Sequence, residues 1–146
     1  MTIRLMTIND YEQVYALWLS TLDMGLNTLD DSEGGIKKYL SRNPSTCFVA
    51  EYDSRIVGVI LSGHDGRRGF IYHAAVCEDM QRRGIGTALV DAAMTALENE
   101  GIHKVALVVY GSNEKGHAFW EKQGFTTRDD LIYRNRSITE LIMIET

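Results

Sequence analysis

The sequence predicts an α/β fold in which helices flank a mixed β-sheet, within a single domain spanning residues 1–146. Three runs that favour strands, residues 47–52, 56–61 and 70–76, are separated by short turns and therefore predict antiparallel neighbours. A long amphipathic helix comes next, followed by the continuous apolar run 105–109. Because a right-handed crossover through a helix makes the following strand parallel, the sheet is expected to be mixed.

The chain before these strands predicts one short strand and two helices. The strand covers residues 3–6, and the first helix begins near Asn9, which forms an approximate capping box with Glu12. Helical spacing relates Val14, Leu17, Trp18 and Leu22. A glycine-containing stretch over residues 23–35 leads to a second helix, which Pro44 prevents from continuing.

The C-terminal part of the chain predicts one more helix and a strand. Asn113 is placed to cap the helix, which stops at Gly124. Residues 131–138 are expected to close the sheet as a strand. The apolar segment 140–146 fits either a short helix or a strand that packs against another copy of the chain.

Composition argues against several classes of protein. The net charge of -5 and the pI near 5.3 disfavour nonspecific attraction to nucleic acid or membrane surfaces. No apolar run approaches the ~20 residues that cross a bilayer, and no secretory signal pattern begins the chain, so we expect a cytoplasmic protein. Cys47 and Cys77 are expected to be free thiols, and the scattered histidines predict no metal site.

An anion-binding turn is predicted in residues 76–89, where an apolar strand runs through a short acidic link into Gln-x-x-Gly-x-Gly and then a helix. The first turn of a helix leaves about four N–H groups free and carries a partial positive charge. Gly84 and Gly86 let a ligand approach the backbone, while Arg82 and Arg83 add cations. The turn therefore predicts a cradle for a diphosphate.

A second motif lies downstream in residues 113–125, Asn-Glu-Lys-Gly-His-Ala-Phe-Trp-Glu-Lys-Gln-Gly-Phe. In order and separation, the two motifs resemble the cofactor-binding motifs of the Gcn5-related N-acetyltransferase (GNAT) superfamily. The resemblance implies the acyl-CoA N-acyltransferase fold: a central mixed sheet of six or seven strands, flanked by about four helices. It also implies that the fourth and fifth strands splay apart, and that the pantetheine arm of acetyl-CoA inserts between them.

The resemblance further implies which residues hold acetyl-CoA. The N–H groups from Gln81 to Thr87 would bind the diphosphate, and Asn113 would bind the pantetheine arm. The residues expected at the cofactor are Ala75, Val76, Gln81, Arg82, Arg83, Gly84, Ile85, Gly86, Thr87, Asn113 and Trp120. The alternative for the two arginines is a solvated surface, and the alternative for Asn113 is a helix cap alone.

Acyl transfer from a thioester to an amine needs a neutral amine, a stabilised oxyanion and a departing thiolate. A strand N–H near Val76 is where the family places the donor that polarises the thioester. Many members protonate the leaving sulfur with a tyrosine at the position of Trp120, whose indole cannot serve as that acid. Tyr110, Tyr133 or water would substitute, and Trp120 would pack against the cofactor or the sheet.

His73 is the candidate base, because its unperturbed pKa suits proton collection near neutral pH; a hydrogen-bonded structural role is the alternative. Members that acetylate protein N-termini often carry a glutamate where this chain has Val108, which weakens that assignment. Glu51 and Tyr72 are further candidates for a contribution to this proton transfer. Cys77 lacks the partners of an acyl-accepting nucleophile and is expected to be a passive thiol.

The leading hypothesis is therefore an acetyl-CoA-dependent N-acetyltransferase that acts by direct transfer on a small-molecule or peptide amine. Two alternatives stay open, a noncatalytic acyl-CoA-binding regulatory module and a protein N-terminal or lysine acetyltransferase. The resemblance implies that the first two helices and the stretch between them border the acceptor site. Acidic residues in this region would suit a cationic amine, and they are Asp23, Asp30, Asp31 and Glu33. A homodimer is the default expectation, because twofold-symmetric dimers are the commonest oligomers. Neither nucleic acid nor a membrane is expected as a partner.

Overall fold

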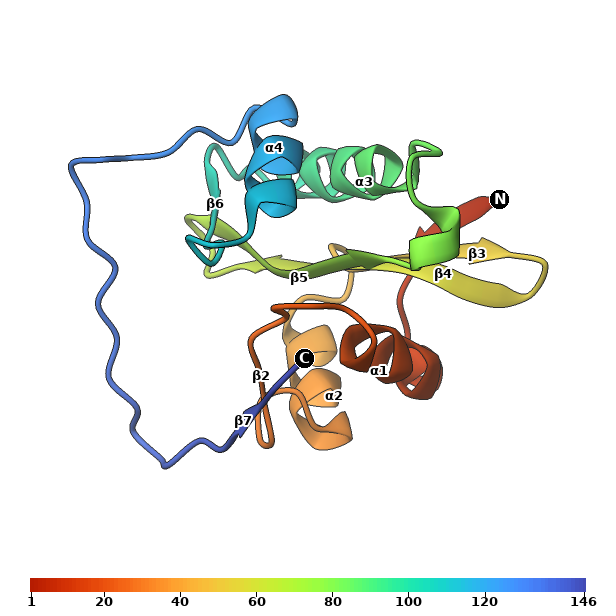
Figure 1. The fold of residues 1–146 in the computed structure, drawn as a ribbon, viewed down its shortest axis with the longest axis horizontal. Coiled ribbons are helices and arrows are strands. Elements are labelled where there is room, and N and C mark those ends of the chain that lie inside the picture. The colour runs from red at the N-terminus through yellow and green to blue at the C-terminus, as the bar shows by residue number, and fades with distance from the viewer.

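The computed structural model describes residues 1–146 and places a central β-sheet between two layers of helices (Figure 1). The sheet has the strand order β1-β3-β4-β5-β6. Its strands are β1 (Thr2–Leu5), β3 (Phe48–Tyr52), β4 (Arg55–His64), β5 (Gly69–Val76) and β6 (Val105–Leu107). All neighbours are antiparallel except β5 and β6, which are parallel. The mixed α/β fold predicted from the sequence is confirmed.

Four α-helices cover the two faces of this sheet. One face carries α1 (Tyr11–Leu19) and α2 (Glu33–Arg42), and the other carries α3 (Ile85–Asn99) and α4 (Glu114–Lys122) (Figure 1). Short 3₁₀ turns precede α1 and α3, η1 (Ile8–Asp10) and η2 (Glu78–Met80) respectively. None of the helices combines the length and the apolar character needed to cross a membrane.

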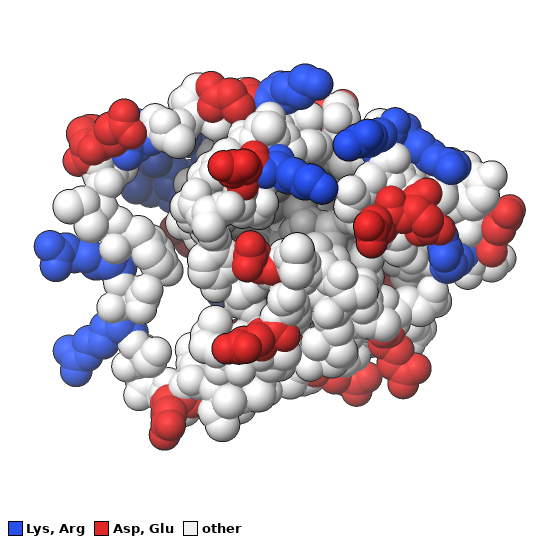
Figure 2. Space-filling view, in the orientation of Figure 1, with Lys and Arg blue, Asp and Glu red and all other residues white.

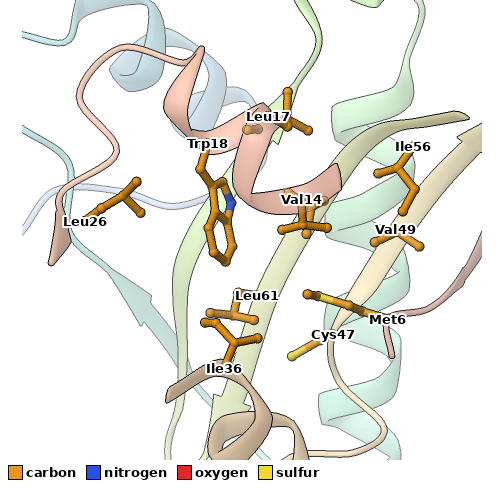
Figure 3. Packing of buried hydrophobic residues seen from close by; sticks show 12 residues of the cluster. Met6, Val14, Leu17, Trp18, Leu26, Ile36, Cys47, Val49, Ile56 and Leu61 are labelled. Atoms are coloured by element: carbon orange, nitrogen blue, oxygen red, sulfur yellow. The ribbon is translucent and has the colours of Figure 1, made fainter. Parts of the chain in front are cut away.

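The central strand β4 separates two hydrophobic clusters, one under each helix layer. In the cluster on the α1 and α2 side, Trp18 is fully buried and lies close to Leu26, Ile36 and Leu61 (Figure 3). The cluster on the other side gathers residues of β4 and β5 around α3, including Ile60, Ile85 and Leu89. Because both faces of β4 are covered, almost every residue of this strand is buried, as its continuous apolar sequence requires.

A bulge in β5 changes which side chains face the α1 and α2 layer. Leu61 pairs with His73 and Ser62 pairs with Ile71, so Tyr72 is an extra residue in β5. Consequently Tyr72 and His73 both contact the α1 and α2 layer, Tyr72 against Tyr39 and His73 against Trp18. This bulge therefore turns the His73 side chain toward the layer formed by α1 and α2.

The predicted closing strand at residues 131–138 was wrong. Residues 126–140 are all exposed, and the chain between α4 and the last few residues forms an extended arm that stands away from the body (Figures 1 and 2). The sheet therefore has five strands. The remaining two, β2 (Leu26–Asn27) and β7 (Met143–Ile144), pair with each other in the same chain. That pairing resolves the ambiguity of the last residues in favour of a strand.

Three smaller expectations also differ from the structure. The capping box expected at Asn9 and Glu12 is instead formed by Thr7 and Asp10 at the start of η1, where the Asp10 carboxylate accepts a hydrogen bond from the Thr7 N–H at 2.9 Å, and Asp10 is the N-cap of α1. Leu22 lies beyond the helix and is exposed. The apolar run at 105–109 is a strand only from Val105 to Leu107, and Val108 is exposed because it leaves the sheet.

Candidate active site

The site begins where β5 and β6 separate. Their parallel pairing extends only from Gly69 to Ile71 on β5, although β5 continues to Val76. On its other edge, β5 pairs with β4: the Cys77 N–H bonds to the Val57 carbonyl at 2.8 Å, and Ala75 lies opposite Val59. Since alternate residues of an antiparallel strand bond to its partner, the polar groups of Val76 point into the gap. The splay expected for the fourth and fifth strands is confirmed.

The predicted anion cradle lies at one end of this gap. The expectation was wrong for the Gln81 N–H, which donates to the Glu78 carbonyl at 3.4 Å. The N–H groups from Arg82 to Thr87 donate to no backbone carbonyl, and the first bond of α3 is from Ala88 to Gly84. Gly84 is the N-cap and has a φ of 80°, a left-handed conformation that glycine adopts without strain. The α3 terminus thus presents free donors together with the positive end of a fifteen-residue helix.

The side chains around the cradle leave it accessible. Arg82 and Arg83 are exposed, and neither forms an ion pair within the chain. Gln81 donates a hydrogen bond from Nε2 to the Val76 carbonyl at 3.2 Å, which ties the turn to the end of β5. Two guanidinium groups are therefore free to meet an anion at a fixed helix terminus.

Helix α4 lies on the β6 side of the gap, and Asn113 caps it as predicted. The Asn113 side chain accepts a hydrogen bond from the Gly116 N–H at 3.0 Å. Trp120 packs edge-on between Phe119 and Phe125, with ring centroids 5.0 and 5.3 Å away. These three aromatic side chains pack against the α3 side of the sheet. Trp120, which occupies the position of the family's tyrosine, therefore has a packing role.

The His73 side chain lies on the face of β5 that α1 and α2 cover, where its Nε2 is 2.8 Å from Oδ1 of Asp31. Both side chains are almost fully buried, with 9% and 6% of their surface exposed. The His73 ring also packs edge-on against Trp18 at 5.0 Å, and its Nδ1 is buried without a hydrogen-bond partner. The histidine thus joins the strand of the site to the segment between α1 and α2.

Three tyrosines, Tyr72, Tyr110 and Tyr133, lie near the gap. Tyr110 follows β6 and reaches the α1–α2 segment, where a Cβ built on Gly25 would lie 3.4 Å from the Tyr110 hydroxyl. Burial raises the pKa of Tyr72, and the nearby Tyr133 and Asp30 raise it further. Tyr133 comes from the C-terminal arm and is exposed. These tyrosines and the cradle border one broad, open cleft.

The structure separates some candidates from the site. Glu51 lies on β3 and pairs with Arg4 at 3.3 Å, away from the gap. Asp31 is buried against His73, so it is not one of the free acceptor-side charges that the sequence suggested. Burial raises the pKa of the Cys77 thiol, which keeps it protonated and agrees with a passive role.

The sequence did not reveal Asp31 as the partner of His73, because the two residues are 42 positions apart and no motif spacing relates them. It also missed a link between the two helices of the site. Gln123 at the end of α4 donates to the Thr87 hydroxyl in the first turn of α3 at 2.9 Å. Glutamine and threonine are common on helix surfaces, so neither residue type signalled this contact.

Comparison with known proteins adds independent information. Residues 11–125, well over half of the chain, match the model of the Acetyltransferase (GNAT) family. An acetyltransferase of Sodalis glossinidius is 32% identical over 140 residues, which cover 96% of this chain and 97% of the relative.

Solved structures share the fold. Ard1 from Thermoplasma volcanium superposes with a TM-score of 0.76 and 26% identity, covering 86% of this chain and 82% of that one. The PaiA N-acetyltransferase from Thermoplasma acidophilum, solved in complex with coenzyme A, has a TM-score of 0.77 at 19% identity. Its match covers 97% of this chain and 96% of that one, and at this identity the likeness concerns the fold alone.

Proposed function

Because the chain belongs to the GNAT family of acetyltransferases, we propose that it transfers the acetyl group of acetyl-CoA to the primary amine of a small molecule or peptide. The observation that carries this proposal is the joining of two features in one cleft. A helix terminus with free N–H groups stands at the end of a gap whose strand edge lacks a partner. A diphosphate attached to an amide-bearing arm would satisfy both features together.

Specific residues would hold such a ligand. The N–H groups between Arg82 and Thr87 would bind the diphosphate, with the two arginine side chains beside them. Amides of the pantetheine arm would pair with the free edge of β5 near Ala75 and Val76. Asn113 already uses its carbonyl oxygen as a cap, and its side-chain NH₂ remains available for the arm.

The reaction would proceed by direct transfer. The amine nitrogen attacks the thioester carbonyl, the new C–N bond forms, and the C–S bond breaks as the tetrahedral intermediate collapses. The amine loses one proton, and the departing thiolate takes up one proton or leaves as the anion. An N–H at Val76, directed into the gap, would stabilise the oxyanion.

Trp120 supplies no proton, so the leaving thiolate depends on another donor. We assign Tyr110 as the first candidate because it stands in the cleft and touches the α1–α2 segment that would border the acceptor. A thiol has a pKa near ~8.5, so loss of an acid is expected to cost about 10²-fold or less. Tyr133 or water remains the alternative donor.

Release of free thiol from acetyl-CoA tests the proposal. The purified protein is mixed with acetyl-CoA and with a panel of polyamines, amino acids, aminoglycosides and short peptides. Acceptor-dependent release, with an acetylated amine found by mass spectrometry, supports the proposed reaction. Tyr110→Phe should then slow release, and Trp120→Tyr should accelerate it if protonation of sulfur limits the rate.

Binding of CoA provides the matched control. The chain has a second exposed arginine pair, Arg67 and Arg68, in the turn at the opposite end of β5 from the cradle. Replacing Arg82 and Arg83 by alanine should weaken CoA binding about tenfold or more, whereas the same change at Arg67 and Arg68 should leave it unaltered. Tight CoA binding without turnover for every acceptor would instead favour a regulatory acyl-CoA-binding module.

A further inference from the structure

We propose that the buried hydrogen bond between His73 and Asp31 fixes the acceptor side of the cleft, and that His73 is a positioning residue for the transfer. This inference rests on the proposed function. It concerns the acceptor segment, residues 24–31, which connects α1 to α2 and borders the cleft through Met24, Gly25, Asn27 and Asp30. The pair links this segment to β5, the strand that would hold the acyl group.

Asp31 organises the acceptor segment through three hydrogen bonds. Its Oδ1 faces His73 Nε2 at 2.8 Å, and its Oδ2 accepts from the Asn27 N–H at 2.9 Å. Its backbone carbonyl accepts from the Tyr11 hydroxyl at 2.7 Å. Because a carboxylate can only accept hydrogen bonds, His73 must carry its proton on Nε2 and donate it. A single buried side chain therefore ties the segment both to itself and to β5.

The acceptor segment is held on its other side by the end of the chain. Leu26 pairs with Ile144 in the β2–β7 ladder. The Thr28 N–H donates to the Ile142 carbonyl at 3.0 Å, and the Met24 N–H donates to the Thr146 hydroxyl at 3.1 Å. The His73–Asp31 bond is the only hydrogen bond that connects this assembly to β5, the strand of the site.

The position of His73 makes this connection relevant to the reaction. Val76, whose N–H would face the thioester, lies three residues further along β5, or about 10 Å at ~3.3 Å per residue. The acceptor segment is thus held in position relative to β5, the same strand that would place the acyl carbon. Displacement of a reactant by about 1 Å can cost about 10²-fold in rate, so the alignment of segment and strand affects turnover.

Neither member of the pair is open to an acceptor. The remaining ring nitrogen of His73, Nδ1, is buried without a partner, and both oxygens of Asp31 are already engaged. The proton that His73 holds on Nε2 is committed to Asp31. The histidine therefore acts through the segment it anchors, and we assign it no direct proton transfer with substrate.

Kinetics of His73→Ala provide the first test, using acetyl-CoA and whichever panel amine the wild-type protein acetylates. The KM for the amine should rise, or kcat fall, by about tenfold or more, while the Kd for CoA stays within about twofold. His73→Gln should recover part of the loss, because its amide can donate to Asp31. Unchanged amine kinetics in a folded His73→Ala protein would overturn the proposal.

Hydrogen exchange provides a test that needs no acceptor. The Asn27 amide and its neighbours up to residue 31 should exchange about tenfold faster in His73→Ala than in wild type. Val57→Ala removes buried volume from the cluster under α3, which does not include the acceptor segment. It controls for global destabilisation and should not accelerate exchange selectively in residues 27–31. Unchanged exchange would overturn the anchoring role whether or not an acceptor is known.

The two measurements separate this proposal from the proposed function. Faster exchange of the acceptor segment without any turnover in wild type would contradict the enzymatic function and support the anchor alone. If His73→Ala fails to fold, Asp31→Asn replaces it, because asparagine leaves one carbonyl oxygen for two donors. Normal exchange in a folded Asp31→Asn protein would then contradict the anchor.

Discussion

Gly86, in the first turn of α3, lies against the ring of Phe119 on α4. A Cβ built on Gly86 would meet Cε1 and Cζ of that ring at 3.0 and 3.1 Å, closer than ordinary van der Waals contact. The second residue of α3 is therefore a glycine because α4 packs onto the first turn of α3. From the sequence, we expected this glycine to let a ligand approach the backbone. The structure shows that it also lets α4 approach α3.

The contact predicts that Gly86→Ala is destabilising. Alanine gains up to about 1 kcal/mol of helix propensity, but displacement of Phe119 should cost about 1–3 kcal/mol. Gly34, also the second residue of a helix, is the matched control, since its Cβ would lie 4.0 Å from the nearest atom. Urea unfolding should show Gly34→Ala to be more stable than Gly86→Ala, and the reverse order would contradict the packing argument.

Asn113 is predicted to have two roles, which a second cap can separate. Asn113→Ala should lower the free energy of unfolding by about 1 kcal/mol through loss of the α4 cap. Ser32 caps α2 in the same way, accepting from the Gly35 N–H at 3.0 Å, so Ser32→Ala should cost a similar amount. Calorimetry should show weaker CoA binding only in Asn113→Ala. Equal binding in both variants would leave Asn113 as a cap alone.

The Asp10 carboxyl predicts a loss of stability in acid. Burial raises its pKa, but hydrogen bonds from Arg4 and from the Thr7 N–H outweigh burial and hold the pKa below its ordinary value. The stabilisation is therefore complete above the unfolded pKa of about 3.9 and is lost as pH falls through the lower folded value. Urea unfolding from about pH 6 to about pH 2 should show a larger loss for wild type than for Asp10→Asn.

Asp130 offers a control for that measurement. It forms the same two-bonded pair with Arg128, at 2.8 and 2.9 Å, but both residues lie exposed in the arm and only two positions apart. Such a local, solvated pair contributes little to folding. Asp130→Asn should therefore leave the acid dependence of stability unchanged, and a wild-type curve no steeper than that of Asp10→Asn would contradict the role of Asp10.

The C-terminal arm is predicted to be the first site of proteolysis. Residues 126–140 are exposed and make no regular structure, so trypsin should cut first after Arg134 or Arg136. Arg67 and Arg68 are also exposed, but their N–H groups both bond to Asp65 at 2.8 Å in a tight turn. Mass spectrometry of early digests gives the order of cleavage, and a first cut at Arg67 or Arg68 would contradict this account.

Local patterns were sufficient for most of the fold and for the cradle. Strand alternation, short turns and helix caps depend on residues within a few positions of one another, so the order β3-β4-β5-α3-β6 and the cap at Asn113 followed from the sequence. The closing strand failed for a physical reason. A strand also needs a partner edge, and residues 131–138 have strand-like composition but lie apart from the sheet.

The helix terminus with free donors beside a strand could be predicted from local chemistry, because glycine, glutamine and arginine at that spacing act on their own neighbours. The groups that surround this terminus depend on contacts between distant parts of the chain. The bulge at Tyr72 turns His73 toward Asp31, and the packing of α4 places Phe119 over Gly86. Both contacts join residues that are more than thirty positions apart, and only the folded chain brings them together.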